Sequence, residues 1–112
     1  MDFDNKLQNI LDKMNNHMAT YYRECDVFSD DADTWIERST YTTMVGRKYV
    51  KIVREGAVVA FIDKGTGDIF KPATWQAPAK GVRGNLFSAH DGMEALNFSS
   101  NGLVFVYYAR GF

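Results

Sequence analysis

The 112-residue chain contains few of the residue types that hold covalent or metal-bound scaffolds together. It has a single cysteine, Cys25, so no internal disulfide can form, and its two histidines, His17 and His90, are far apart in the sequence. These absences argue against a disulfide-stapled secreted domain and against a zinc site built from cysteine and histidine. A formal net charge of -1 argues against a generally basic nucleic-acid-binding protein but leaves room for a local positive patch.

Long apolar runs are also missing. No stretch approaches the roughly 20 residues that a membrane-spanning helix requires. The first six residues include two aspartates and one lysine, so they lack the basic start of a signal peptide. We therefore expect a soluble, cytoplasmic protein. The length suits one domain over residues 1–112, and 46% hydrophobic with 14% aromatic residues predicts a small core filled by large side chains.

Apolar residues recur at helical spacing in the first 25 residues. The main series alternates steps of four and three, the pattern of an amphipathic helix, and comprises Leu7, Leu11, Met14, Met18, Tyr21 and Cys25. With Asp4 as a candidate N-cap, the sequence predicts a helix over residues 4–25. Its stripe can cover a sheet or close one end of a barrel, or it can pair with a second copy of the helix. His17, beside the stripe, is interpreted as a boundary residue.

An acidic segment follows this helix. It holds four aspartates within eight residues, namely Asp26, Asp30, Asp31 and Asp33. A calcium-binding loop is one interpretation, but the segment lacks the glycine at the sixth position and the closing glutamate at the twelfth that an EF-hand requires. We therefore interpret it as a solvated linker and expect no metal site.

Strand-forming residues dominate the next part of the chain. Two strands are expected, over residues 35–43 and 48–54, separated near Gly46. A Glu-Gly turn at residues 55 and 56 then leads into a third strand. Because these connections are short, we expect an antiparallel meander.

The stretch from Val58 to Phe87 is the centre of the chain's organisation. Its first two strands are joined by a turn with glycines where a hairpin needs positive φ. Pro72 and Pro78 end the second strand, because proline lacks the amide hydrogen that a central strand donates. The residues up to about Ala79 should therefore form a loop.

Four more features are expected downstream of this loop. They are a short strand over residues 82–87, a helical turn or irregular crossing at residues 90–96, a turn at residues 99–102, and a strand over residues 103–108. The last strand is apolar on both faces, so it should be central or covered on both sides. The fold class is α+β or mostly β: an N-terminal amphipathic helix followed by a small, strongly bent antiparallel sheet or barrel of the Sm-like or SH3-like kind.

The sequence carries no catalytic or phosphate-binding motif. GxSxG, P-loop and GxGxxG patterns are absent, and the Gly-Thr-Gly-Asp run at residues 65–68 lies between strands instead of leading into a helix. His90 and Asp91 form a candidate acid–base pair, but we interpret Asp91 as the cap of a short helix. We therefore predict a non-enzymatic protein without a cofactor; an enzyme would need His90 in a deep pocket beside a carboxylate.

The central loop has the most distinctive composition. Between residues 64 and 83, four basic residues accompany a single acidic one and are interleaved with Phe70 and Trp75. Exposed aromatic rings stack on bases while nearby cations neutralise phosphates, so this mixture suits single-stranded nucleic acid. The alternative is that Phe70 and Trp75 are core residues and the lysines only keep the loop soluble.

Two resemblances bear on function. The run GDIFKPATWQAPAKGVRGN, residues 67–85, resembles a segment of small proteins of unknown function encoded by tailed bacteriophages, particularly marine ones, which implies expression inside an infected bacterium. Residues 82–85, Val-Arg-Gly-Asn, resemble the hydrophobic-Arg-Gly-Asn element in the second motif of Sm-like RNA-binding proteins. In that family the element lies in a loop at the pore of a ring, so the resemblance implies that Arg83 and Asn85 contact RNA.

The sequence thus predicts a homo-oligomeric small β-barrel module that binds RNA or single-stranded DNA. Its nucleic-acid-binding residues are expected to be Lys71, Trp75, Lys80, Arg83 and Asn85, with the basic side chains on phosphates and Trp75 stacked on a base. The alternative is a phage structural or interaction protein with no nucleic-acid role, whose loop or helix stripe docks on a phage or host protein. No membrane, metal or cofactor is expected.

Overall fold

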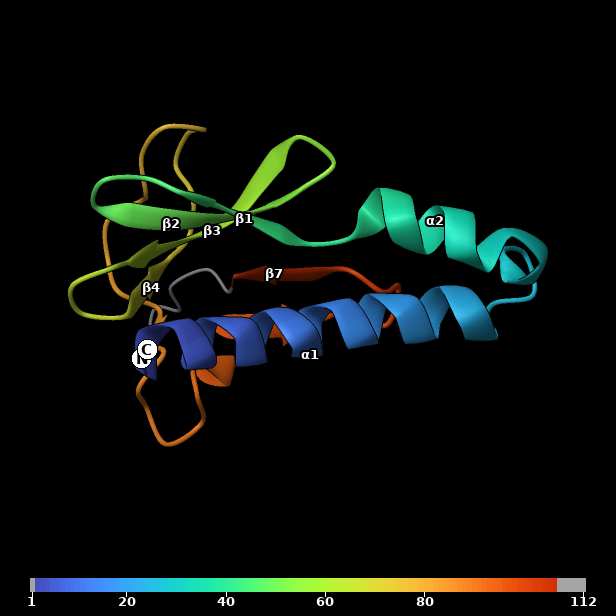
Figure 1. The fold of residues 1–112 in the computed structure, drawn as a ribbon, viewed down its shortest axis with the longest axis horizontal. Helices are drawn as coiled ribbons and strands as arrows, with labels where there is room; N and C mark the ends of the chain where they lie inside the picture. The colour runs from blue at the N-terminus through green and yellow to red at the C-terminus, as the bar shows by residue number, and fades with distance from the viewer. Residues whose placement is uncertain (1, 107–112) are drawn as a thin grey trace.

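A computed structural model describes residues 2–106, which fold into a long helix, a shorter helix and two antiparallel sheets (Figure 1). The larger sheet lies across the N-terminal half of the long helix, and the shorter helix lies beside its C-terminal half. The helical elements are α1 (Asp2–Glu24), η1 (Ser29–Asp31), α2 (Ala32–Ser39) and η2 (Met93–Ala95). The strands are β1 (Thr42–Val45), β2 (Tyr49–Arg54), β3 (Ala57–Asp63), β4 (Asp68–Phe70), β5 (Gly84–Asn85), β6 (Leu96–Phe98) and β7 (Val104–Val106).

The predicted N-terminal helix is confirmed as α1. Its buried residues recur every four positions, at Ile10, Met14, Met18 and Tyr22, so one face of the helix enters the core. Burial of each side chain of this size stabilises the fold by roughly 1.5–3 kcal/mol. His17 is half-buried beside this face, and its Nε2 lies 2.6 Å from the carbonyl oxygen of Ser99, as suits a boundary position.

The prediction of a strand over residues 35–43 is wrong in its first half, because residues 32–39 form α2. Ala32, Trp35, Ile36 and Ser39 recur at helical spacing, and all four are buried or half-buried. Trp35 stacks on Tyr22 of α1, with ring centroids 6.1 Å apart. Packing against α1 therefore decides the structure of residues that alone are compatible with a strand.

The larger sheet is an antiparallel meander in the order β1-β2-β3-β4-β5, as the short connections predict. The turn between β3 and β4 is the predicted glycine turn: Gly67 has a φ of 81°, and a Cβ there would lie 2.7 Å from the ring of Phe87. The carboxylate of Asp63 also accepts the N–H groups of Gly65 and Thr66, at 2.7 and 3.1 Å. The positive φ and the close approach of Phe87 together require glycine at position 67, for both its backbone conformation and its small size.

Only one face of this sheet packs on α1. Cross-strand neighbours Ile52 and Ala60, and the pair Ile62 and Ile69, are buried in the same core cluster as the buried face of α1. Side chains alternate along a strand, so the residues between them lie on the outer face, away from α1. The cross-strand row Met44, Lys51, Phe61 and Phe70 lies on this outer face.

Within residues 2–106 the sheet stays open, because β1 and β5 do not pair and no barrel closes. The C-terminal elements depart from expectation in detail: β5 has two residues, and β6, which was not expected, pairs with β7 in a second sheet. Val104 and Val106 are buried, but Leu103 and Phe105 are exposed, so β7 is covered on one face only. The predicted continuation to Tyr108 lies outside the described residues.

None of the helices described between residues 2 and 106 combines the length and apolar character needed to cross a membrane.

Candidate nucleic-acid interface

The predicted loop after β4 is a compact hairpin-like excursion. Pro72 and Pro78 form an isolated antiparallel bridge, and the N–H of Ala79 donates to the carbonyl oxygen of Lys71 at 2.7 Å. At the tip, the hydroxyl of Thr74 accepts the N–H groups of residues 76 and 77, both at 3.1 Å. These bonds hold Trp75 at the end of the loop in a defined position.

Trp75 lies over the outer face of the sheet and remains open to solvent. Its exposed fraction is 42%, so the indole is neither sealed in the core nor fully free. The Nζ of Lys51, on β2, lies 4.5 Å from the centroid of the indole and 5.8 Å from the centroid of Phe61. At this distance the ammonium is attracted by the negative face of each ring. The loop thus folds back over the sheet and is anchored there by a cation.

The outer face beneath and beside the loop is aromatic. Tyr49 makes edge contacts with Phe61 and Phe70, at centroid distances of 5.7 and 6.0 Å. Phe61 is only 1% exposed, whereas Phe70 is half-buried and Tyr49 has Lys48 within 5.5 Å of its ring. The interpretation of Phe70 and Trp75 as sealed core residues therefore does not hold, and the sealed residue of this face is Phe61.

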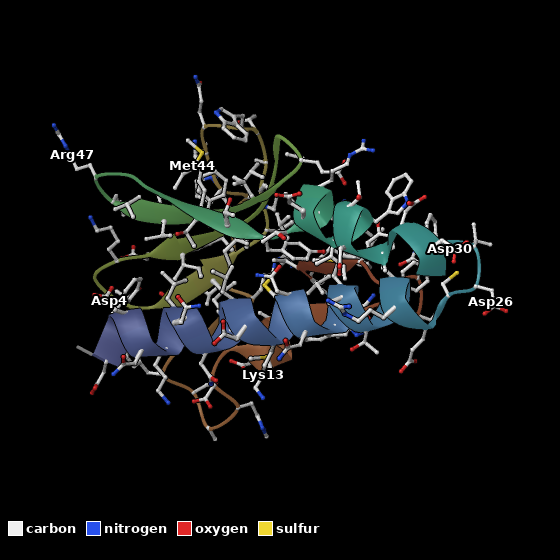
Figure 2. The ribbon with its side chains drawn as sticks, turned by 45° about the vertical axis from the view of Figure 1, so that its right-hand side comes forward. Asp4, Lys13, Asp26, Asp30, Met44 and Arg47 are labelled. Carbon is white, nitrogen blue, oxygen red and sulfur yellow. The ribbon has the colours of Figure 1, made fainter. Side chains whose placement is uncertain are left out.

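Charge is divided unevenly between the two parts of the chain. Residues 1–46 hold four basic and nine acidic residues, a net of -5, whereas residues 47–83 hold eight basic and three acidic residues, a net of +5. Figure 2 shows Arg47 and Met44 at the sheet end of the molecule and Asp26 and Asp30 at the opposite end. An approaching polyanion would therefore be steered toward the sheet and its loop.

The five predicted binding residues lie in different surroundings. Lys80 and Trp75 are exposed. Lys71 is half-buried and borders a cavity of about 370 Å³ that lies between β3 and β7 and also contacts Arg54. Arg83 is half-buried, and its Nε and Nη1 have no hydrogen-bond partner among residues 2–106.

Asn85 is committed to the fold. Its Nδ2 donates to the carbonyl oxygen of Thr66 and to the carboxylate of Asp68, both at 2.9 Å, and its Oδ1 accepts the N–H of Phe87 at 2.7 Å. Because both ends of the amide are already bonded, Asn85 holds the β3–β4 turn against β5.

A carboxylate lies next to this end of the predicted site. Glu94 accepts the N–H of Asn85 at 3.0 Å and the hydroxyl of Ser88 at 2.8 Å. Burial raises the pKa of Glu94, but these hydrogen bonds outweigh it and hold the pKa below its ordinary value of 4.5. A charged carboxylate beside Asn85 disfavours a phosphate there, so the surface best suited to a polyanion is centred on Trp75.

Lys51 is a site residue that the sequence does not reveal. The alternation in residues 48–54 places it on the face opposite Val50 and Ile52, but only the strand pairing brings it against Phe61 and beneath a loop 24 residues further along. Tyr49 and Lys48 join the site for the same reason.

Candidate metal-ligating and acid–base residues in the described part of the chain lie as follows. No group of three or more histidine, cysteine, aspartate or glutamate side chains between residues 2 and 106 is placed to hold a metal ion. His90 is exposed, and the carboxylate of Asp91 is paired with the ammonium of Lys6.

The fold and this surface together define a helix-backed antiparallel sheet with a cationic, aromatic outer face. Residues 3–105 match a family of unknown function, DUF7717, and the chain belongs to this family. No curated protein and no solved structure matches the chain significantly.

Proposed function

We propose that this protein is a non-enzymatic module that binds single-stranded nucleic acid, RNA or DNA, as a homo-oligomer. The observation that carries the proposal is the half-exposed indole of Trp75, held by the Lys51 ammonium at 4.5 Å in the most basic part of the chain. A base stacks on the open part of the indole, and such stacking contributes about 1–3 kcal/mol per base.

Basic side chains around the indole contact the phosphates in this proposal. Lys51 and the exposed Lys80 are the principal contacts, with Lys71 and Arg83 at the margin of the surface. Each phosphate neutralised releases condensed counterions, so binding weakens steeply as salt rises. As part of the same proposal, this activity belongs in the cytoplasm of an infected bacterium, as the loop's resemblance to tailed-phage proteins implies.

The test uses Trp75 as its own reporter. In a Trp35→Phe background Trp75 is the sole tryptophan, and titration with oligo(U) or oligo(dT) at low salt should quench its fluorescence. Lys51→Met should weaken binding about tenfold and lower the salt slope by about one. The matched control is Lys13→Met, because Lys13 is exposed on the side of α1 away from the sheet (Figure 2).

Two results would refute the proposal. One is the absence of any fluorescence or anisotropy response to either oligonucleotide at low salt. The other is a loss of affinity in Lys13→Met that equals the loss in Lys51→Met, because binding would then follow net charge and not this surface.

A second candidate function is docking on a phage or host protein without any nucleic acid. Exposed apolar side chains support it: Val82 and Phe87 flank the short strand β5 and are both about half exposed. Single surface apolar residues are common, whereas contiguous apolar patches mark contact surfaces. Capture of one specific partner that survives nuclease treatment and is lost in Val82→Ser/Phe87→Ser would favour this function.

A further inference from the structure

The outer edge of the sheet at β1 has backbone groups that pair with nothing among residues 2–106. The N–H of Gly46 donates to the carbonyl oxygen of Tyr49 at 2.8 Å, which makes these two residues a hydrogen-bonded pair at the start of the β1–β2 ladder. Hydrogen-bonded pairs alternate along an antiparallel ladder, so Met44 also bonds to β2. Thr43 and Val45 therefore direct their N–H and C=O groups away from β2, toward the open edge.

The backbone of Tyr41, just before this open segment, is hydrogen-bonded to a side chain of α1. Tyr41 continues the alternation, so its backbone groups also face the edge. Its N–H donates to Oδ1 of Asn15 at 2.7 Å, and its carbonyl oxygen accepts from Nδ2 of Asn15 at 3.1 Å. The side-chain amide of Asn15 therefore bonds the backbone of Tyr41 as a neighbouring strand would. It does not reach Thr43.

The two edges of the sheet differ in how they are protected. The far edge, β5, has only two residues, and the N–H of Asn85 is bonded to Glu94. β1 has neither proline nor charge between Thr42 and Val45, and its apolar side chains Met44 and Val45 are 48% and 70% exposed. Edges that soluble proteins leave solvent-facing are normally blocked by such devices, and an unblocked edge is a template for another strand.

We propose that a second copy of this chain pairs with β1 in antiparallel fashion, about a two-fold axis that passes through Met44. In this register Thr43 of each copy lies opposite Val45 of the other. The N–H and C=O groups left open on both copies then form four hydrogen bonds. The two Met44 side chains meet on the axis, and the two sheets become one. The inference rests on the homo-oligomeric part of the proposed function and names its interface.

Charge supports this arrangement. Arg47 would lie opposite Tyr41 of the second copy, and Glu37 of that copy lies about 10 Å further back along its α2 and the connection to β1. Two long side chains span that distance. Figure 2 shows Arg47 beyond one end of β1 and α2 beyond the other, so the two-fold axis brings the basic end of each copy to the α2 end of its partner.

The pairing also doubles the proposed nucleic-acid surface. A two-fold axis of this kind is perpendicular to the sheet, so both outer faces point the same way. The two Lys51 residues, each on β2, are then separated by three strand spacings, about 15 Å. One continuous strand of nucleic acid can cross Trp75 and Lys51 of both copies, which would give a longer binding site than one copy offers.

Cysteine cross-linking without nucleic acid tests the interface and its register. In a Cys25→Ser background, Met44→Cys should form a disulfide-linked dimer on mild oxidation, because the axis brings the two Cα atoms to about 4.5 Å. Val45→Cys is the matched control: it is more exposed, yet its two copies are about 8 Å apart, beyond disulfide reach. Val45→Pro removes an edge N–H and no bond to β2, so it should give a folded monomer.

Light scattering should give about twice 12.7 kDa for the unmodified protein and 12.7 kDa for Val45→Pro with an unchanged circular dichroism spectrum. A monomer at 100 μM, or a dimer in which Val45→Cys cross-links as readily as Met44→Cys, would overturn the interface. If the protein is a monomer and oligo(U) still quenches Trp75, the interface and the homo-oligomeric part of the proposed function are wrong, and nucleic-acid binding stands. If it is the expected dimer with no oligonucleotide response, only the nucleic-acid function is wrong.

Discussion

Asn15 is predicted to be one of the most important polar residues for stability, because its side chain joins α1 to the start of the sheet. Asn15→Ala would remove both hydrogen bonds to Tyr41, at 2.7 and 3.1 Å. Tyr41 is 1% exposed, so water does not readily replace the lost partner. The variant leaves one backbone donor and one acceptor without their bonds.

The magnitude follows from the two bonds and from helix propensity. Each hydrogen bond contributes about 0.5–1.5 kcal/mol net, so together they contribute about 1–3 kcal/mol. Alanine favours the helix over asparagine by up to about 0.7 kcal/mol, which partly hides the loss. Asn16→Ala makes the same propensity change at the neighbouring exposed position of α1. The difference between the two variants, about 2 kcal/mol, therefore isolates the bonds to Tyr41.

Urea unfolding monitored by circular dichroism measures this difference, and thermal unfolding should show a gap of roughly 8 °C between the two variants. Measurement at two protein concentrations separates the effect from any dissociation of a dimer, which would make the midpoint concentration-dependent. If Asn15→Ala and Asn16→Ala unfold within about 0.5 kcal/mol of each other, the amide does not fasten the sheet to α1 and the reasoning fails.

Two further predictions concern single polar contacts and their pH dependence. Tyr41→Phe should cost about 1–3 kcal/mol in urea unfolding, because the buried hydroxyl accepts the N–H of Val104 at 2.9 Å. Burial raises the pKa of Tyr41 above 10, so the stability difference between wild type and Tyr41→Phe should shrink as pH rises past 10. Equal stability of the two proteins below pH 9 would contradict the prediction. Glu94→Gln should destabilise at pH 6, and the difference from wild type should shrink as pH falls below 4.5, because the pKa of Glu94 is lowered and its contribution disappears as the carboxylate is protonated. A pH-independent difference would exclude this cause.

Local spacing alone accounts for much of the fold. The helix over residues 4–25 follows from the recurrence of apolar side chains, and the structure places α1 at Asp2–Glu24. The hairpins at Gly46, Gly56 and Gly67 follow from turn chemistry, which acts within four or five residues. These elements could be predicted because the interactions that define them lie within a few residues along the chain.

The candidate site could be predicted only in part. Trp75 and its loop stand out by composition, and the two prolines correctly mark the end of β4. A four-residue pattern does not show what the side-chain amide of Asn85 bonds to, and the fold uses this amide to hold the β3–β4 turn.

The sequence by itself determined where α1, the hairpin turns and the tryptophan loop lie, since periodicity and turn residues act locally. Only the tertiary structure decided that residues 32–39 are helical, that Lys51 lies against the indole of Trp75, and that the outer edge of β1 is open within the described part of the chain. Each of these depends on which distant segments pack or pair together. That choice is made by burial of whole faces and by strand register, which no short window of residues contains.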